Sequence, residues 1–230
     1  MTRLSRALIR ALLLTTLAAL LISALFVGAS WWALRSDRGT LQLMSWLPGL
    51  EVTQAKGSIW GDFQAERLTY TWPNGSTLVV VAPRWQGLSV VRTDQAAWRL
   101  GLSIRSLQAQ SADLQWRASA TSGPLKVPAS LALPVAVRID ELSVARFQSN
   151  LTGDAPWTGL KASLSLQSGA THELVLMHLA RQDWTVQGRT RVGVSRPMTL
   201  SGNWTATSRQ GQGVLNISGP LAQPRVQGRV

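Results

Sequence analysis

The 230 residues contain no cysteine, which excludes a disulfide framework and every thiolate metal site. The two histidines, His172 and His178, would share one face of an unbroken strand, but Glu173 would point to the other face, so a third metal ligand is missing. No serine lies in a Gly-x-Ser-x-Gly or Ser-x-x-Lys motif. Asp140 and Glu141 are adjacent and would point to opposite faces of a strand, so they cannot act as a carboxylate pair. We therefore expect no catalytic site, no metal site and no cofactor.

Acidic side chains are also few, with 11 Asp and Glu against 23 Lys and Arg, and the formal net charge is +12. Of the basic residues 20 are arginines, and they are spread singly along the chain rather than in runs. Nucleic-acid binding usually requires a clustered basic patch. The charge pattern therefore predicts a face that meets water or lipid headgroups, and no nucleic-acid partner.

One long segment lacks charge altogether. Residues 11–34 hold 24 consecutive uncharged residues, and as a helix they would be about 36 Å long, against about 30 Å for a hydrocarbon core. Arg10 and Arg35 flank the segment, and Trp31 and Trp32 stand where aromatic residues meet lipid headgroups. We predict a transmembrane signal-anchor helix with these four residues as its interface anchors.

The orientation of this helix follows from its flanking charges. Residues 1–10 carry three arginines, which predicts a cytoplasmic N-terminus and places the bulk of the chain in the periplasm of a Gram-negative cell. The alternative is a signal peptide cleaved after Ala29, but the apolar run is longer than the 7–15 residues of a usual signal peptide. A retained inner-membrane anchor is the favoured interpretation.

After a connector at residues 35–49, apolar and polar residues alternate with the period of β-strands through residues 50–230. Clear segments of this kind are residues 67–72, 98–105, 112–117, 135–144 and 160–167, with further ones to the end of the chain. Five tryptophans follow one another at spacings of 14, 12, 13 and 13 residues, which predicts about one per strand: Trp46, Trp60, Trp72, Trp85 and Trp98. No amphipathic helix of useful length is expected after residue 34.

One face of every predicted strand is apolar, and no helix is available to cover it. The sheet must bury this face as a sandwich, a barrel or a curled trough. If it is an open trough, it would accept acyl chains, while arginines at its rim would pair with phosphate headgroups. The candidate lining residues are Leu68, Tyr70, Trp72, Trp98, Leu100, Leu102, Ile104, Leu114, Trp116, Val135, Val137, Ile139, Leu160, Leu164 and Leu166.

Several segments of the chain carry a family resemblance. They are residues 47–52 (LPGLEV), 57–68 (GSIWGDFQAERL), Asn74-Gly75, Pro83-Arg84-Trp85 and, most tellingly, 133–144 (LPVAVRIDELSV). Together with the N-terminal anchor they resemble the N-terminal portion of the TamB family, the AsmA-like inner-membrane subunits of the translocation and assembly module. The motifs are degenerate β patterns that extend over the whole chain.

The resemblance implies a mainly β protein with an elongated, curled, antiparallel or meandering sheet, shaped like a taco around a hydrophobic groove. It also implies outer-membrane protein assembly with a TamA-like barrel partner, phospholipid transport between the membranes, or both. The cargo would be phospholipid or an unfolded outer-membrane protein. Family members are much longer than this chain, so the TamA-contacting region would lie outside it. The alternatives are a GspN-like component of type II secretion, suggested by the Gly-x-x-Trp segment at 57–60, and a structural β scaffold.

Overall fold

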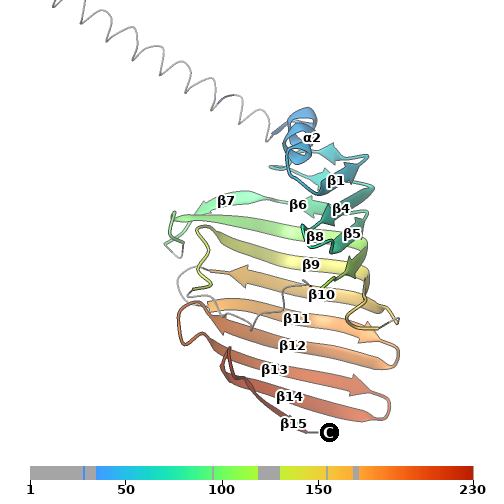
Figure 1. The fold of residues 1–230 in the computed structure, drawn as a ribbon, viewed down its shortest axis with the longest axis vertical. Helices are drawn as coiled ribbons and strands as arrows, with labels where there is room; N and C mark the ends of the chain where they lie inside the picture. The colour runs from blue at the N-terminus through green and yellow to red at the C-terminus, as the bar shows by residue number, and fades with distance from the viewer. Residues whose placement is uncertain are drawn as a thin grey trace, which may run out of the picture.

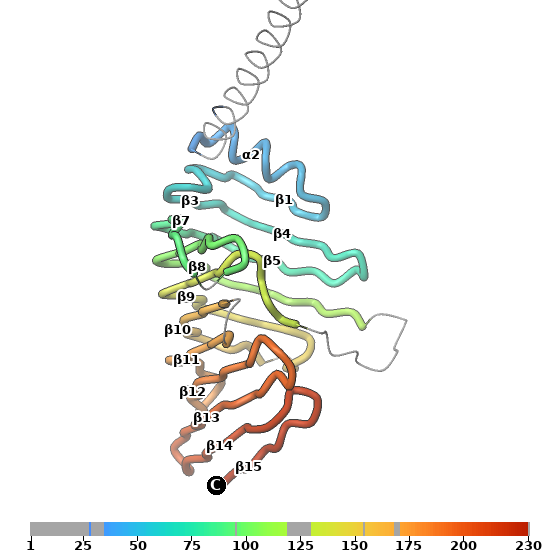
Figure 2. The backbone as a smooth tube through the Cα atoms, turned by 90° about the vertical axis from the view of Figure 1, so that its left-hand side faces the viewer, coloured from blue at the N-terminus to red at the C-terminus, as the bar shows by residue number. Residues whose placement is uncertain are grey.

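The computed structural model describes residue 28 and residues 35–94, 96–118, 130–153, 155–167 and 171–229. All described strands belong to one sheet, whose main path is β1-β4-β5-β8-β9-β10-β11-β12-β13-β14-β15. The strands follow one another along the long axis of the molecule, from β1 beside the helix to β15 at the far end (Figures 1 and 2). The first and last strands do not pair, so the sheet is open. The prediction of a mainly β protein is confirmed.

Short elements come first and long strands follow. The first part contains α2 (Asp37–Ser45), β1 (Leu50–Thr53), β2 (Lys56–Gly57), β3 (Phe63–Gln64), β4 (Arg67–Thr71), β5 (Thr77–Val81), β6 (Arg84–Gln86) and β7 (Ser89–Arg92). The second contains β8 (Leu100–Gln115), β9 (Ala136–Ser149), β10 (Trp157–Leu166), β11 (Thr171–Arg181), β12 (Trp184–Gly193), β13 (Thr199–Ser208), β14 (Gly211–Pro220) and β15 (Arg225–Arg229).

The helix α2, of nine residues, occupies the segment expected to be a plain connector. Ser36 caps it, with its side chain accepting a hydrogen bond from the Gly39 amide at 3.1 Å. Met44 on its buried side packs with Phe63 and Ala65 in a small core. This core anchors the first, short strands, which are too short to bury much apolar area by themselves.

The strand pairing departs from a pure antiparallel meander at one place. β8 and β9 are parallel, with Leu102 opposite Val137 and Ile104 opposite Ile139, while every other pair is antiparallel. Parallel neighbours need a crossover, because the chain must return to the starting end of the first strand. The antiparallel pairing expected for the sheet therefore holds at the other pairs and is interrupted at this one.

Side chains of opposite character occupy the two faces of the sheet. One cross-strand row contains Ile104, Ile139, Leu164 and Leu174, and we call its side the apolar face. The neighbouring row contains Ser103, Arg138, Ser165, Glu173 and Arg191, and we call its side the polar face. Since all described strands lie in a single open sheet, no second sheet covers the apolar face among them, and neither the sandwich nor the barrel is found there.

β8 is one continuous strand of 16 residues where the sequence predicts two separate segments. Its apolar residues lose their strict alternation twice, between Ile104 and Leu107 and between Ala109 and Ala112. Leu107, Ala109 and Ala112 nevertheless lie on one side of the strand, where they line a hollow in the sheet surface. Register shifts on β10 lie close to these points, and Gly159 there has a φ of 65°. Such β-bulges bend a strand and shift its alternation by one residue, which interrupts the sequence pattern without ending the strand.

The expectation of one tryptophan per strand is wrong for the five periodic tryptophans. Only Trp85 lies within a strand; Trp60 and Trp98 lie in turns, Trp46 caps α2, and Trp72 follows the end of β4. The first strands have only two to five residues, so a spacing of about 13 residues spans more than one strand and turn. The period therefore reflects no structural repeat.

A glycine opposite a tryptophan shapes the apolar face of β12. Gly188 pairs with Trp204, and a Cβ at Gly188 would lie 2.6 Å from both the backbone carbonyl oxygen of Asn203 and the Trp204 ring. The indole thus lies across the bare glycine backbone, and its Nε1–H donates to Thr190 Oγ1 at 3.0 Å. Only glycine leaves room for this arrangement.

We therefore expect Gly188→Ala to lower the free energy of unfolding by about 1–3 kcal/mol, because the added methyl group displaces Trp204 or the backbone of β13. Denaturant melts followed by far-ultraviolet circular dichroism measure this effect. Gly211→Ala is the control, since a Cβ there meets nothing within 4 Å. Equal stability of the two variants would contradict the close packing of Gly188 and Trp204.

Among the described residues, no helix has the length and apolar character needed to cross a membrane. Of the predicted span at residues 11–34, only Gly28 falls within the described part of the chain. The anchor residues Arg10, Trp31 and Trp32 also lie outside it, and Arg35 begins the described segment 35–94.

Candidate functional site

The apolar face is the candidate site, and ten predicted lining residues lie on it within strands. Leu68 and Tyr70 pair with Val80 and Leu78, which in turn pair with Ala112 and Leu114. The remaining eight are Leu102, Ile104 and Leu114 in β8, Val137 and Ile139 in β9, and Leu160, Leu164 and Leu166 in β10. Most of this face is half-buried, and no second sheet among the described strands covers it.

The other five predicted lining residues lie at the ends of strands. Leu100 begins β8 and Val135 precedes β9. Trp98 lies in the turn before β8 and is 67% exposed, because Arg99 has a φ of 52° that ends the alternation. Trp72 and Trp116 follow the ends of β4 and β8, with ring centroids 6.4 Å apart.

Toward the N-terminal end, the apolar face contains a hollow of about 210 Å³. Apart from Gln108, its lining residues are apolar: Leu68, Leu78, Val80, Pro83, Trp85, Leu107, Ala109, Ala112, Leu142 and Val144. Trp85 closes one side, stacked on Phe63 with ring centroids 3.9 Å apart. This site has the chemistry to hold hydrocarbon and little else.

Two further hollows lie on the apolar face toward the C-terminal end. One, of about 340 Å³, is lined by residues that include Val186, Trp204, Ala206 and Leu215. The other, of about 300 Å³, is lined by Trp157, Arg181, Gln182, Trp184, Val186 and Ala206. Because Val186 and Ala206 line both, the two hollows are continuous.

One end of the strands is marked by tryptophans, a feature that the sequence analysis missed. Trp72, Trp116, Trp157 and Trp184 stand at the ends of β4, β8, β10 and β12, which are every second strand of the sheet path. We call these four residues the tryptophan edge. The sequence places each of these tryptophans next to a turn, which indicates the end of a strand. That the four lie at the same end of the sheet depends on the strand order.

The opposite end of the strands is partly covered by the described end of the β8–β9 crossover. The Leu131 amide donates to the Val194 carbonyl at 3.0 Å, and His172 Nε2 lies 2.9 Å from the Leu131 carbonyl. Since a carbonyl only accepts, Nε2–H is the donor, while Nδ1 accepts from the Gln167 amide at 3.2 Å. The two ends of the apolar face therefore differ. At one end His172 holds the crossover, and at the other end lies the tryptophan edge.

The histidines do not come together. A register shift in β11 between Leu176 and Leu179 interrupts the alternation of side chains between His172 and His178, and His178 pairs with Lys161. Among the residues that the structure describes, no group of three metal-ligating side chains occurs. Both ring nitrogens of His172 are already hydrogen-bonded, Nε2 to the Leu131 carbonyl of the crossover and Nδ1 to the Gln167 amide.

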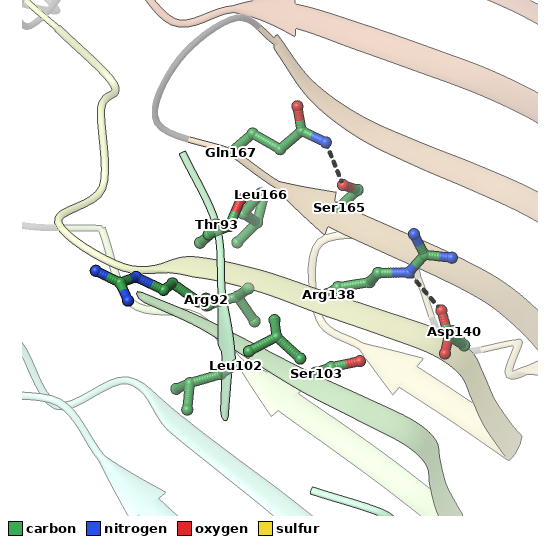
Figure 3. A pocket seen from close by; sticks show the side chains of 13 residues that line it. Arg92, Thr93, Leu102, Ser103, Arg138, Asp140, Ser165, Leu166 and Gln167 are labelled. Atoms are coloured by element: carbon green, nitrogen blue, oxygen red, sulfur yellow. Dashed lines mark hydrogen bonds and ion pairs between the residues drawn. The ribbon is translucent and has the colours of Figure 1, made fainter. Parts of the chain in front are cut away.

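The polar face contains a shallow hollow of about 440 Å³ beside β7 (Figure 3). Its floor is formed by small residues, including Gly101 and Ala136. Around it, the Arg138 Nε donates to Asp140 Oδ1 at 2.6 Å, and Gln167 Nε2 donates to Ser165 Oγ at 3.3 Å, as the dashed lines show. These polar groups bond to one another, and the paired Arg138 and Asp140 side chains are largely exposed to solvent.

Ion pairs also join neighbouring strands on the polar face. Glu173 accepts a hydrogen bond from Arg191 Nε at 2.9 Å and forms an ion pair with Arg189, whose Nε lies 3.2 Å away, so one carboxylate in β11 pairs with two guanidinium groups in β12. The two arginine side chains are about half exposed and Glu173 is 29% exposed, and such surface pairs contribute little stability. The polar face is therefore a hydrated surface with a network of charge pairs.

Comparisons of the chain with models of known protein families, with characterised proteins and with solved structures give no match.

Proposed function

We propose that the chain is a membrane-anchored envelope protein whose apolar face binds the acyl chains of phospholipids and supports their passage along the sheet. The observation that carries this proposal is the apolar face, which no second sheet among the described strands covers and which contains hollows lined mainly by hydrocarbon. A soluble protein rarely exposes so large an apolar surface unless a ligand or partner covers it.

The energetics favour a lipid occupant. Each methylene group removed from water contributes about 0.8 kcal/mol, so even part of one acyl chain lying on this face stabilises the complex by several kcal/mol. The polar face, with its charge pairs, remains in water. A structural scaffold would need a second layer over the apolar face, and the described strands provide none.

The proposed setting is the inner membrane, with residues 11–34 as the anchor, residues 1–10 in the cytoplasm and the sheet in the periplasm. The uncharged length of the segment and its flanking arginines support this topology. In this arrangement α2 and the first strands follow directly after the anchor, close to the source of lipid. The resemblance to the TamB family supports a role in outer-membrane biogenesis with a TamA-like partner.

Photo-crosslinking in cells tests the lipid proposal. A photoreactive amino acid at Leu164 on the apolar face is expected to capture phospholipid at least several times more often than one at Ser165 on the polar face. The two positions are neighbours in β10 and differ only in the face they occupy, so Ser165 is the matched control.

Mass spectrometry of the adducts distinguishes the outcomes. Equal lipid capture at Leu164 and Ser165 would overturn the proposal. Adducts at Leu164 that contain only polypeptide would also overturn it, in favour of an unfolded outer-membrane protein as cargo.

A further inference from the structure

Each of the two adjoining hollows on the apolar face of β12–β15 has one arginine among its lining residues, Arg181 in the hollow at the tryptophan edge and Arg229 in the other. Their shared floor, Val186 and Ala206, lies between Trp204 and Leu215 on one side and the tryptophan edge on the other. Arg181 is the one cationic side chain among the residues that line the hollow at this edge. A cation at the mouth of a hydrocarbon-lined hollow is the arrangement that fits an anionic amphiphile.

The surroundings of Arg181 leave its charge available. Its guanidinium carbon lies 5.2 Å from the centroid of the Trp157 ring, a cation–π contact that orients the group without neutralising it. None of the three ion pairs within the described residues includes Arg181. Its Nη2 lies beside Gly153 in the turn after β9, where an added Cβ would be only 3.4 Å away. Asp183 lies in the same hairpin turn and is exposed.

The two indoles beside Arg181 indicate the chemistry of the ligand. Trp157 and Trp184 have an apolar ring and a polar N–H, and tryptophan is enriched where hydrocarbon gives way to headgroups. A fatty-acid carboxylate would fill only a small part of the hollow of about 300 Å³ at this edge, whereas a phosphodiester headgroup suits its size. Arg also binds phosphate oxygens in a bidentate manner.

We propose that this is a phospholipid headgroup site. The phosphate lies at Arg181 between Trp157 and Trp184, and an acyl chain extends over Val186 and Ala206 toward Trp204 and Leu215. The inference rests on the proposed function and adds to it a direction: headgroups lie at the tryptophan edge, away from the end fastened by His172.

Because the chain has no cysteine, a single introduced cysteine gives a unique labelling site. The full chain in detergent, carrying a fluorophore at Gln182→Cys, is titrated with a phosphatidylcholine that bears a nitroxide on its headgroup. Gln182 lines the mouth of the hollow. The positional control is Gln223→Cys, an exposed turn residue at the opposite end of the strands. We expect saturable quenching at position 182 and little at position 223.

Arg181→Gln is expected to raise the half-saturating lipid concentration about tenfold, since a charge-assisted contact to phosphate is lost. Arg209→Gln is the matched control: it lies in the next hairpin turn, outside the hollow, and should leave binding unchanged. Equal effects of the two variants, or none from Arg181→Gln, would overturn the headgroup site while leaving lipid capture at Leu164 intact. Equally strong, Arg181-dependent competition by a fatty acid of the same chain length would overturn the phosphate assignment. Absence of quenching together with absence of lipid capture at Leu164 would overturn the proposed function as well.

Discussion

Phe63→Ala should destabilise the N-terminal part of the sheet by about 3–5 kcal/mol, the range for removing a buried aromatic side chain. Phe63 is 2% exposed, stacks on Trp85, and packs with Met44 of α2, so its removal leaves a cavity at the junction of helix and sheet. Trp85 also donates from Nε1 to the Ile59 carbonyl at 3.1 Å, which limits its ability to move into the space.

The measurement is the free energy of unfolding from denaturant titration, together with proteolysis of the segment around α2. Trp98→Ala is the control, because this aromatic side chain is mostly exposed and should cost less than about 0.5 kcal/mol. A loss from Phe63→Ala no larger than that of the control would contradict the assignment of this cluster as a core.

Leu174→Asp should reduce lipid capture at Leu164 by a factor on the order of ten. Leu174 lies directly opposite Leu164 on the apolar face, and an ionised carboxylate there must lose water whenever an acyl chain covers it. A tenfold reduction corresponds to about 1.4 kcal/mol, which is small beside the cost of desolvating a charge.

Val175→Asp is the matched control for this variant. Val175 is the next residue of β11, lies on the polar face opposite Ser163 and Arg189, and should leave lipid capture unchanged. The readout is the photo-adduct yield at Leu164 with circular dichroism to verify folding. Equal losses from both variants would indicate general destabilisation rather than a blocked lipid path.

The faces of the long strands are the part of the fold that the sequence predicts best. Leu102 and Ile104, Val137 and Ile139, and Leu164 and Leu166 alternate with polar residues, and burial of one face is enough to fix their side. The bulges could not be read in the same way, since a bulge looks like the end of a strand in an alternating pattern. In β8, the two breaks in alternation between Ile104 and Ala112 divide the prediction into two segments.

The alternation of apolar and polar residues does not predict features that depend on the connectivity of the strands or on very short elements. Alternation is the same in parallel and antiparallel strands, so it does not distinguish the β8–β9 pairing from the others. The helix α2 has only nine residues, about two and a half turns, too few for a clear period, although Ser36 followed by Asp37 is a recognisable helix start. The tryptophan edge emerges only when strand order brings Trp116, Trp157 and Trp184 to the same end.

The open pairing order also makes the length of the sheet modular. From β9 to β15, each strand contacts only the strand before and the strand after it. The free energy of unfolding is therefore close to a sum of the contributions of single strands and of the contacts between neighbouring strands. The hairpins β11–β12 and β13–β14 turn through two residues each, Gln182 with Asp183 and Arg209 with Gln210. Adding or removing one such pair leaves the direction of every later strand unchanged. A fold of this kind can therefore vary its reach by whole hairpins without redesigning the rest.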